Sequence, residues 1–223
     1  MFKKVLIAED HESANISVQK TLADLNIPFH PANFVYYCDD ALNRIQKALR
    51  EHEPYELLIS DLSFDDDYTP QKIVRGTELI KAARAIQPDL KVLIFSIENR
   101  AKIVHSLFKN LDIDAYVPKA RQDAKDLKIA IETLSKGKKY VSPNLKRTTA
   151  DESYHDFSIL DKGIIKALIE GKLQKEIPQH LEHLKIRPSG LSSVEKRLKL
   201  MKENLDFSTN EQLIAYCIET GVV

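Results

Sequence analysis

The fold is decided by the stretch Val5-Leu6-Ile7-Ala8-Glu9-Asp10, in which a short apolar run stops at two carboxylates. The stretch Leu57-Leu58-Ile59-Ser60-Asp61 repeats this pattern with one carboxylate at its end. Two later apolar runs also stop at a polar side chain, at Ser96 and at Lys119. In an open parallel sheet, ligands bind outside the carboxyl ends of the strands. We therefore expect three carboxylates, a hydroxyl and an ammonium group to meet in one crevice that suits a divalent cation and a phosphoryl group.

Segments with helical spacing alternate with apolar runs through the first half of the chain. The expected strands are residues 4–9, 34–38, 57–60, 92–96 and 115–118. The expected helices are residues 13–25, 39–51, 76–86, 101–110 and 123–135. This alternation predicts an α/β fold with a doubly wound, five-stranded parallel sheet covered by helices. A generic α/β core whose acidic residues only cap helices also fits each acidic residue taken alone.

The composition of the 223 residues limits the classes of function. The chain has 33 Lys and Arg against 33 Asp and Glu, so a nucleic-acid site must be a local basic patch. Its only two cysteines, Cys38 and Cys217, fit neither a disulfide framework nor a zinc site, which favours a reducing compartment. The first apolar run is too short for a signal peptide and no later run is long enough to span a membrane, so we expect a cytoplasmic protein.

The second half of the chain predicts a linker followed by a small all-α domain. Residues 137–156 are mostly polar, as linkers are. Beyond them, helical spacing predicts helices over residues 158–170, 173–184 and 192–205 and a last helix from residue 208. Capping patterns that open at Ser192 and Ser208 place the caps of the last two helices at these residues. Pro178 should kink the second of these helices or mark a later start. The predicted domains are therefore residues 1–136 and 157–223.

The third of these helices carries a basic face. If Val194 and Leu198 point to the core, then at 100° per residue Ser192, Lys196, Lys199 and, less directly, Ser193 point outward. Arg197 lies at the edge of the apolar stripe. The candidate DNA-binding residues on and before this helix are Lys185, Arg187, Ser192, Ser193, Lys196, Arg197 and Lys199. Basic side chains there could neutralise phosphates and reach base edges. The alternative is a solvated helix face that happens to be rich in lysine.

The residues at the strand ends resemble those of a known family. Residues 1–136 are similar to the receiver domain of two-component response regulators, and the matching residues are Glu9, Asp10, Asp61, Ser96, Tyr116 and Lys119. The resemblance implies a flavodoxin-like fold in which Asp61 accepts a phosphoryl group. It further implies that Ser96 and Lys119 contact this group and that the rotamer of Tyr116 reports the switch.

The same resemblance implies a magnesium site. Its ligands would be Glu9, Asp10, Asp61 and the backbone carbonyl of Ser63. Mg²⁺ is bound in proteins by one or two carboxylates together with waters and phosphate oxygens, which suits this set. Carboxylates packed together repel one another and hold protons more tightly until a cation is bound. We expect no turnover of an external substrate, because the acceptor is a side chain of the protein itself.

The second half resembles the output domain of LuxR/NarL-type regulators. The similarity lies in the joining segment Tyr140–Leu145 and in the motifs Glu170-Gly171-Lys172, Lys175-Glu176-Ile177 and Ser193-Val194. The turn before the third helix is longer than in that family. The resemblance implies a homodimeric transcription regulator that binds duplex DNA through a helix-turn-helix. Its phosphoryl group would come from a sensor histidine kinase or a small phosphodonor.

Two features depart from the receiver pattern. Residues 64–75 make a loop much longer than usual after Asp61, and its acidic residues 65–67 either are simply solvated or tune metal affinity or kinase recognition. Ile97 follows the switch hydroxyl, where the family usually has a small residue. Its branched side chain either crowds the phosphoryl site or points into a pocket opened by the altered loop.

Two other classes of function stay open. The first is a regulator that works without phosphorylation, through protein contact or its level of expression, and the second is a magnesium-dependent phosphoryl-transfer enzyme with a small substrate. His180 and His183 are spaced as a metal pair, but no third ligand is near them in the sequence, so we expect a surface or packing role. His11 is expected to start the first helix, although it could contact a metal-bound water.

Overall fold

The computed structural model describes residues 1–65, 67–146, 155–205 and 207–223. The chain forms two compact units, Met1–Thr149 and Ala150–Val223. The boundary between the units falls inside the segment predicted as a linker. The predicted domain limits at residues 136 and 157 stay a prediction. Among the described residues, no helix has the length and apolar character needed to cross a membrane.

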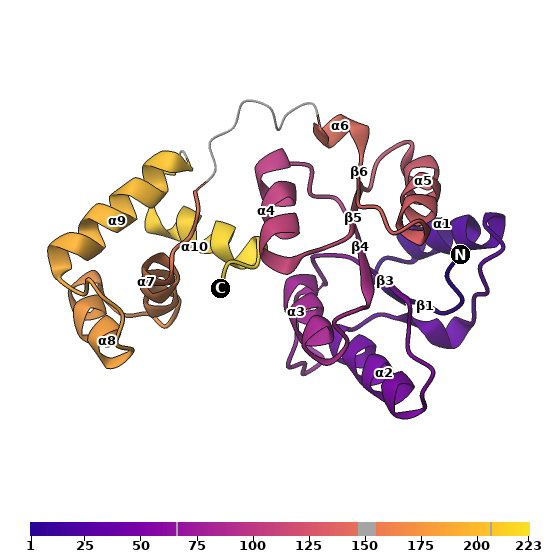
Figure 1. Ribbon diagram of the computed structural model, residues 1–223, viewed down its shortest axis with the longest axis horizontal. Coiled ribbons are helices and arrows are strands. Elements are labelled where there is room, and N and C mark those ends of the chain that lie inside the picture. The colour runs from indigo at the N-terminus through magenta and orange to yellow at the C-terminus, as the bar shows by residue number, and fades with distance from the viewer. Residues whose placement is uncertain (66, 147–154, 206) are drawn as a thin grey trace. The chain divides into compact units, whose positions relative to one another are not determined.

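The first unit contains a parallel sheet with the strand order β2-β1-β3-β4-β5-β6 (Figure 1). The strands are β1 (Val5–Ala8), β2 (Phe34–Val35), β3 (Leu57–Ser60), β4 (Lys91–Ser96), β5 (Ala115–Pro118) and β6 (Tyr140–Val141). The predicted doubly wound parallel sheet is confirmed. The predicted number of strands was too low by one, because β6 lies in the segment read as linker. Two apolar residues are too few to give a periodic signal, yet Tyr140 donates its N–H to Asp114 and buries its ring.

Helices cover both faces of this sheet. They are α1 (Glu12–Asp24), α2 (Cys38–Arg50), α3 (Gly76–Ile86), α4 (Ala101–Leu111) and α5 (Asp123–Ser135), with a 3-10 turn η1 (Pro31–Asn33) and a short helix α6 (Pro143–Lys146). Successive strand residues point to opposite faces. Val5 and Ile7 of β1 pack with α1 and α5, whereas Leu6 and Ala8 pack with α2 and α3. The strands are therefore buried on both faces, as their continuous apolar sequence predicts.

The strand register brings the polar strand ends together. In the β1–β3 pair, Ala8 lies opposite Ser60, so Glu9 and Asp61 leave the sheet at the same level. The chain passes from β1 to β2 on one side and then crosses β1 to reach β3 on the other. A switch point of this kind leaves a crevice at the carboxyl ends of the two central strands.

The second unit is a bundle of four helices within its described residues. These are α7 (Ile159–Ile169), α8 (Ile177–His183), α9 (Leu191–Asn204) and α10 (Asn210–Glu219), with a 3-10 turn η2 (Gln174–Glu176) before α8. Its core is built from fully buried apolar side chains, among them Ile164, Leu181, Val194, Met201 and Leu213. The predicted small helical domain is confirmed.

The helix starts differ from prediction in detail. Pro178 lies in the first turn of α8, so the later start is the correct alternative. Helix α9 begins at Leu191 with Gly190 at its N-cap, and the predicted cap at Ser192 is wrong. Glycine reaches the cap conformation without offering a side-chain acceptor, so the capping pattern did not identify it. In α10 the cap is Thr209, one residue after the expected position, with Gln212 completing the capping box.

Candidate functional site

Asp61 is held at the end of β3 by its own backbone and by the turn that follows. Its N–H donates to the carbonyl of Ala8 over 3.1 Å, which continues the β1–β3 ladder one step past the strand. Its Oδ1 accepts from the N–H groups of Leu62 at 2.5 Å and Ser63 at 3.4 Å. Asp61 is buried, with 3% of its surface exposed. The second oxygen, Oδ2, is therefore the one that faces the remaining charged groups of the crevice.

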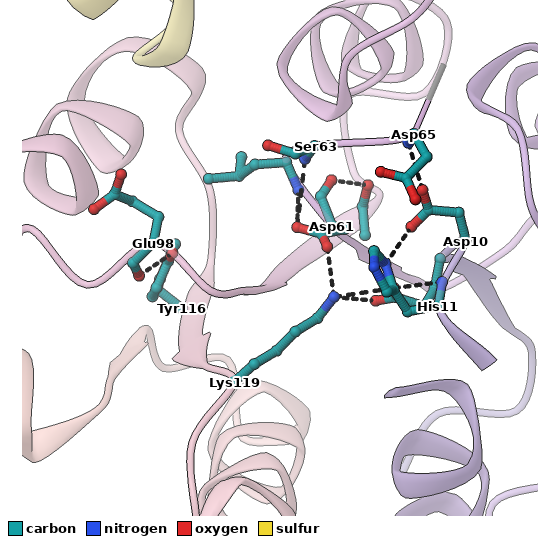
Figure 2. A network of polar contacts seen from close by, with 11 residues as sticks. Asp10, His11, Asp61, Ser63, Asp65, Glu98, Tyr116 and Lys119 are labelled. Atoms are coloured by element: carbon teal, nitrogen blue, oxygen red, sulfur yellow. Dashed lines mark hydrogen bonds and ion pairs between the residues drawn. The ribbon is translucent and has the colours of Figure 1, made fainter. Parts of the chain in front are cut away.

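Lys119 faces that oxygen from the end of β5. Its Nζ lies 2.5 Å from Oδ2 of Asp61 and 2.8 Å from Oε2 of Glu9. Figure 2 marks the contact between Lys119 and Asp61 with a dashed line. Burial would lower the pKa of the ammonium, but its hydrogen bonds to Asp61 and Glu9 outweigh burial and raise the pKa. Lys119 is thus a fixed positive charge between two buried carboxylates.

Four side chains at the ends of β1 and β3 could hold a cation. One ligand atom each from Glu9, Asp10, His11 and Asp61 lies within 4.8 Å of the others. Burial raises the pKa of Glu9 and the charge of Asp61 adds to this, while the hydrogen bond and charge of Lys119 lower it. A hard divalent cation with oxygen ligands would relieve this repulsion, so the donor set fits Mg²⁺ or a similar ion.

His11 has the first of the two roles considered from the sequence, and its contact with a metal-bound water stays a prediction. It is the N-cap residue of α1, so the expected helix start is confirmed. Its Nδ1 also lies 2.8 Å from Oδ1 of Asp10, and this hydrogen bond, followed by the charge of Asp10, raises the pKa of the imidazole. The side chain is 57% exposed, so it stands on the solvent side of the acidic cluster.

The residues predicted as switch residues lie on β4, which pairs with β3, and on β5, the next strand of the sheet. Ser96 ends β4 and is buried, and its carbonyl accepts the N–H of Lys119 at 2.8 Å. Tyr116 is fully buried in β5, and its hydroxyl donates to the carbonyl of Glu98 at 2.6 Å (Figure 2). Burial raises the pKa of this phenol, followed by the nearby charges of Glu98 and Asp61. The segment after β4 is therefore tied to β5 at two points.

Two sequence expectations near this segment have different outcomes. Ile97 is 74% exposed, so the idea that it fills a pocket is wrong, and its steric effect on phosphoryl exchange stays a prediction. Ser63 is exposed and forms an isolated antiparallel bridge with Arg75. The assignment of its carbonyl to the metal also stays a prediction.

Gly76 is a site residue that the sequence reasoning missed. It is the first residue of α3, and a Cβ built on it would lie 1.9 Å from the carbonyl oxygen of Asp61. No side chain fits at that distance, because the helix starts directly against the backbone of Asp61. A glycine at the first position of a helix, just after a long loop, was the only available signal.

The candidate DNA-binding residues divide into two groups. Those that are exposed are Lys185, Arg187, Ser192, Lys196 and Lys199. Ser193 is half-buried in the first turn of α9, and Lys199 also lies 3.7 Å from Glu203 in an exposed pair. Val194 and Leu198 are buried, as the helical spacing predicts. The outward-facing group is therefore a lysine-rich surface of α9 and of the turn before it.

Arg197 differs from the other basic residues of α9. Its Nε donates to Oδ1 of Asp161 at 2.7 Å, and its NH2 group binds Oδ2 of the same carboxylate. Asp161 has no exposed surface and also accepts from the N–H and hydroxyl of Ser158, at 2.9 Å and 2.8 Å. Burial would raise the pKa of Asp161, but hydrogen bonds from His155, Arg197 and Ser158 outweigh it and lower the pKa. The guanidinium thus joins α9 to the start of α7.

No protein-family model and no curated protein matches this chain. Solved structures do resemble it. A structure of two RcsB dimers bound to two parallel DNAs is 22% identical, covers 97% of this chain and 98% of that chain, and gives a TM-score of 0.66. A second structure shows RcsB from Salmonella enterica serovar Typhimurium bound to promoter P1flhDC in the presence of phosphomimetic BeF3⁻. It is 22% identical, covers 97% of this chain and 98% of that chain, and gives a TM-score of 0.60.

The first unit has its own counterpart among solved structures. The isolated REC domain of Salmonella RcsB in the presence of phosphomimetic BeF3⁻ is 25% identical, with a TM-score of 0.53, and covers 65% of this chain and 96% of that chain. The chain therefore has the two-part fold of these RcsB structures, a receiver-like α/β unit followed by a helical unit.

Proposed function

We propose that the protein is a response regulator whose Asp61 accepts a phosphoryl group and whose helical unit binds DNA to regulate transcription. One observation carries the proposal. Lys119 bridges Asp61 and Glu9 beside the acidic cluster, at the switch point of a parallel sheet. These are the groups that phosphoryl transfer to a carboxylate requires, a nucleophile, a fixed cation and a place for a metal.

Glu9, Asp10 and Asp61 would hold Mg²⁺, together with the backbone carbonyl of Ser63. A bound Mg²⁺ would neutralise charge on the phosphoryl oxygens. The protein supplies the rest. An oxygen of Asp61 attacks the phosphorus, a bond to the carboxylate oxygen forms, and the bond from phosphorus to the donor breaks, with the electron pair leaving on the donor. The Lys119 ammonium then pairs with a phosphoryl oxygen, and the Ser96 hydroxyl donates a hydrogen bond to another.

The phosphoryl group adds about −1.5 to −2 charges at neutral pH. Lys119 has one ammonium to share between Asp61, Glu9 and this new charge, so β5 and the segment after β4 must adjust. The same two elements are joined through Ser96 and Tyr116. We infer that this adjustment is the switch, and that it favours a homodimer in which two α9 helices read a two-fold DNA site.

The partners follow from this chemistry. A sensor histidine kinase or a small phosphodonor would supply the phosphoryl group, and duplex DNA would meet the exposed basic residues of α9. We infer that the protein works in the cytoplasm, where its DNA lies. It turns over no external substrate, because the acceptor is its own side chain.

Incubation with acetyl phosphate and Mg²⁺, followed by intact mass measurement, tests the proposal. We expect a gain of about 80 Da, the mass of one phosphoryl group with the charge noted above. Asp61→Asn should abolish the gain. DNA binding without any mass gain would favour the regulator that works without phosphorylation. Steady release of inorganic phosphate from a small substrate, with Asp61→Asn inactive and DNA ignored, would favour the enzyme.

A further inference from the structure

The loop between β3 and α3 is longer than such connections usually are. Strand-to-helix loops in α/β units commonly have about two to six residues, whereas here residues 61–75 separate the two elements. A long loop is uncommon without a function, because its backbone polar groups need partners and its ordering costs entropy. Among their contacts, described residues of this loop reach two places outside it that bear on the site, the start of α2 and the acidic cluster.

The start of α2 holds the outer part of the loop. The hydroxyl of Tyr37, the N-cap residue of α2, donates to Oδ2 of Asp67 at 2.5 Å. Asp39, in the first turn of α2, accepts the N–H of Lys72 at 2.7 Å and that of Ile73 at 3.1 Å. We call these three contacts the α2 clasp. Asp67 is therefore not simply solvated, and the hydrogen bond from Tyr37 lowers its pKa.

The inner part of the loop reaches the acidic cluster. The N–H of Asp65 donates to Oδ2 of Asp10 at 2.5 Å. Figure 2 shows Asp65 and Asp10 joined by this hydrogen bond. The other oxygen of Asp10, Oδ1, is hydrogen-bonded to His11. Both oxygens of this carboxylate are thus held by a neighbour, one from α1 and one from the loop. Each oxygen retains a second lone-pair direction, so this contact can orient the carboxylate without occupying it fully.

We propose that the β3–α3 loop is a positioning element for the cation site, in which the α2 clasp fixes the loop and the Asp65 N–H aims Asp10. The proposal rests on the proposed function, because it assigns the loop to the same acidic cluster. Partners that orient a metal ligand typically change metal affinity by about 10- to 100-fold when they are removed. The loop therefore tunes metal affinity, which is one of the two readings that the sequence left open.

The direct test removes the N–H without touching Asp10. Proline has no backbone N–H, so Asp65→Pro deletes the donor, while Asp65→Ala keeps the donor and removes only the carboxylate. Mg²⁺ binding to the full unphosphorylated chain is measured by isothermal titration calorimetry. We expect Asp65→Pro to weaken binding about tenfold or more, and Asp65→Ala to stay within about threefold of the wild type. An equal loss in both variants would assign the effect to the carboxylate and overturn the positioning role.

The clasp is tested separately with a smaller change. Tyr37→Phe removes only the hydroxyl that meets Asp67, and Tyr36→Phe makes the same change at the neighbouring, 46% exposed tyrosine. Trypsin can cut the loop at Lys72 and Arg75, so the rate of cleavage there reports how firmly the loop is held. We expect Tyr37→Phe to speed cleavage and weaken Mg²⁺ binding, and Tyr36→Phe to change neither. Unchanged cleavage and binding in Tyr37→Phe would remove the clasp from the proposal.

The outcomes separate this inference from the proposed function. If the wild type binds Mg²⁺ and the Asp65→Pro variant binds it equally well, the positioning role fails. The proposal that Asp61 is phosphorylated is not affected by that result. If Mg²⁺ affinity depends on the Asp65 N–H but acetyl phosphate adds no mass to the wild type, the proposed function fails and the positioning role stands. If the wild type binds no Mg²⁺ at all, both fail.

Discussion

The ion pair between Asp161 and Arg197 makes a quantitative prediction about the helical unit. Replacing Arg197 by Met keeps most of the aliphatic stem but leaves Asp161 buried without its cation. Removing one partner of a buried pair costs about 3–5 kcal/mol. Asp161 would keep its hydrogen bonds from Ser158 and His155, and the Arg197 side chain is itself 28% exposed, so we expect the lower end, about 3 kcal/mol.

That loss is large for a unit of this size. Stabilities of about 0.05–0.15 kcal/mol per residue give roughly 4–11 kcal/mol for the residues of the second unit. A loss of 3 kcal/mol should lower the melting temperature of the unit by roughly 12–24 °C, since each kcal/mol shifts a domain of this length by about 4–8 °C. Hydrogen-exchange mass spectrometry on peptides from α7 and α9 measures the loss in unfolding free energy in the full chain, because peptides from the two units are followed separately.

Lys199→Met is the matched control for this prediction. Lys199 lies on the same helix and pairs with Glu203 at 3.7 Å, but its side chain is 77% exposed, so its loss should change stability by less than about 0.5 kcal/mol. If Arg197→Met is as stable as this control, the pair does not stabilise the unit. A stable Arg197→Met variant with weakened DNA affinity would return Arg197 to the DNA-contacting group assigned from the sequence.

Three further predictions concern pH, the acceptor site and DNA. Because the pKa of Asp161 is lowered in the folded protein, its contribution to the free energy of unfolding is complete above its unfolded pKa of about 3.9 and declines as the pH falls toward the folded pKa. Acid unfolding of α7 and α9 that starts well above pH 5 would contradict this. Gly76→Ala should slow phosphorylation of Asp61 more than tenfold, measured by intact mass, because the added Cβ would overlap the Asp61 carbonyl; wild-type rates would show that α3 can move away. Lys196→Ala should flatten the log-affinity against log-salt slope by about 0.9 if it meets one phosphate, and an unchanged slope would remove it from the interface.

The strand ends could be predicted from the sequence because each depends on local pattern alone. A continuous apolar run that stops at Asp61 or Lys119 needs only the rule that parallel strands share one carboxyl edge. The same rule placed Glu9 beside Asp61, and the structure brings these groups within ion-pair distance of Lys119. Local pattern also located α3 and α5 at the bounds observed.

The remaining features depend on partners that are far apart in the sequence. Arg197 was placed at the edge of the apolar stripe of its helix, but only packing of α9 against α7 could reveal Asp161 as its partner. The α2 clasp joins Tyr37 to Asp67 across 30 positions, through a loop with no periodic signal. Gly76 carries no side chain that could signal a role, since its importance comes from the backbone of Asp61 that lies against it.

Lys119 and Tyr116 suggest how one event at Asp61 could reach the surface of the first unit. Tyr116 lies in β5 and Lys119 directly follows this strand. Lys119 contacts the last residue of β4, and Tyr116 contacts the segment that follows β4. The N–H of Lys119 donates to the carbonyl of Ser96, and the hydroxyl of Tyr116 donates to the carbonyl of Glu98. Glu98 in turn forms a two-pronged ion pair with Arg100, the residue before α4. A shift of Lys119 toward a phosphoryl oxygen would therefore pull on the same backbone segment that positions the start of α4. Because packed elements move between discrete arrangements rather than deforming continuously, we expect a displacement of the Lys119 ammonium to shift the start of α4 from one such arrangement to another.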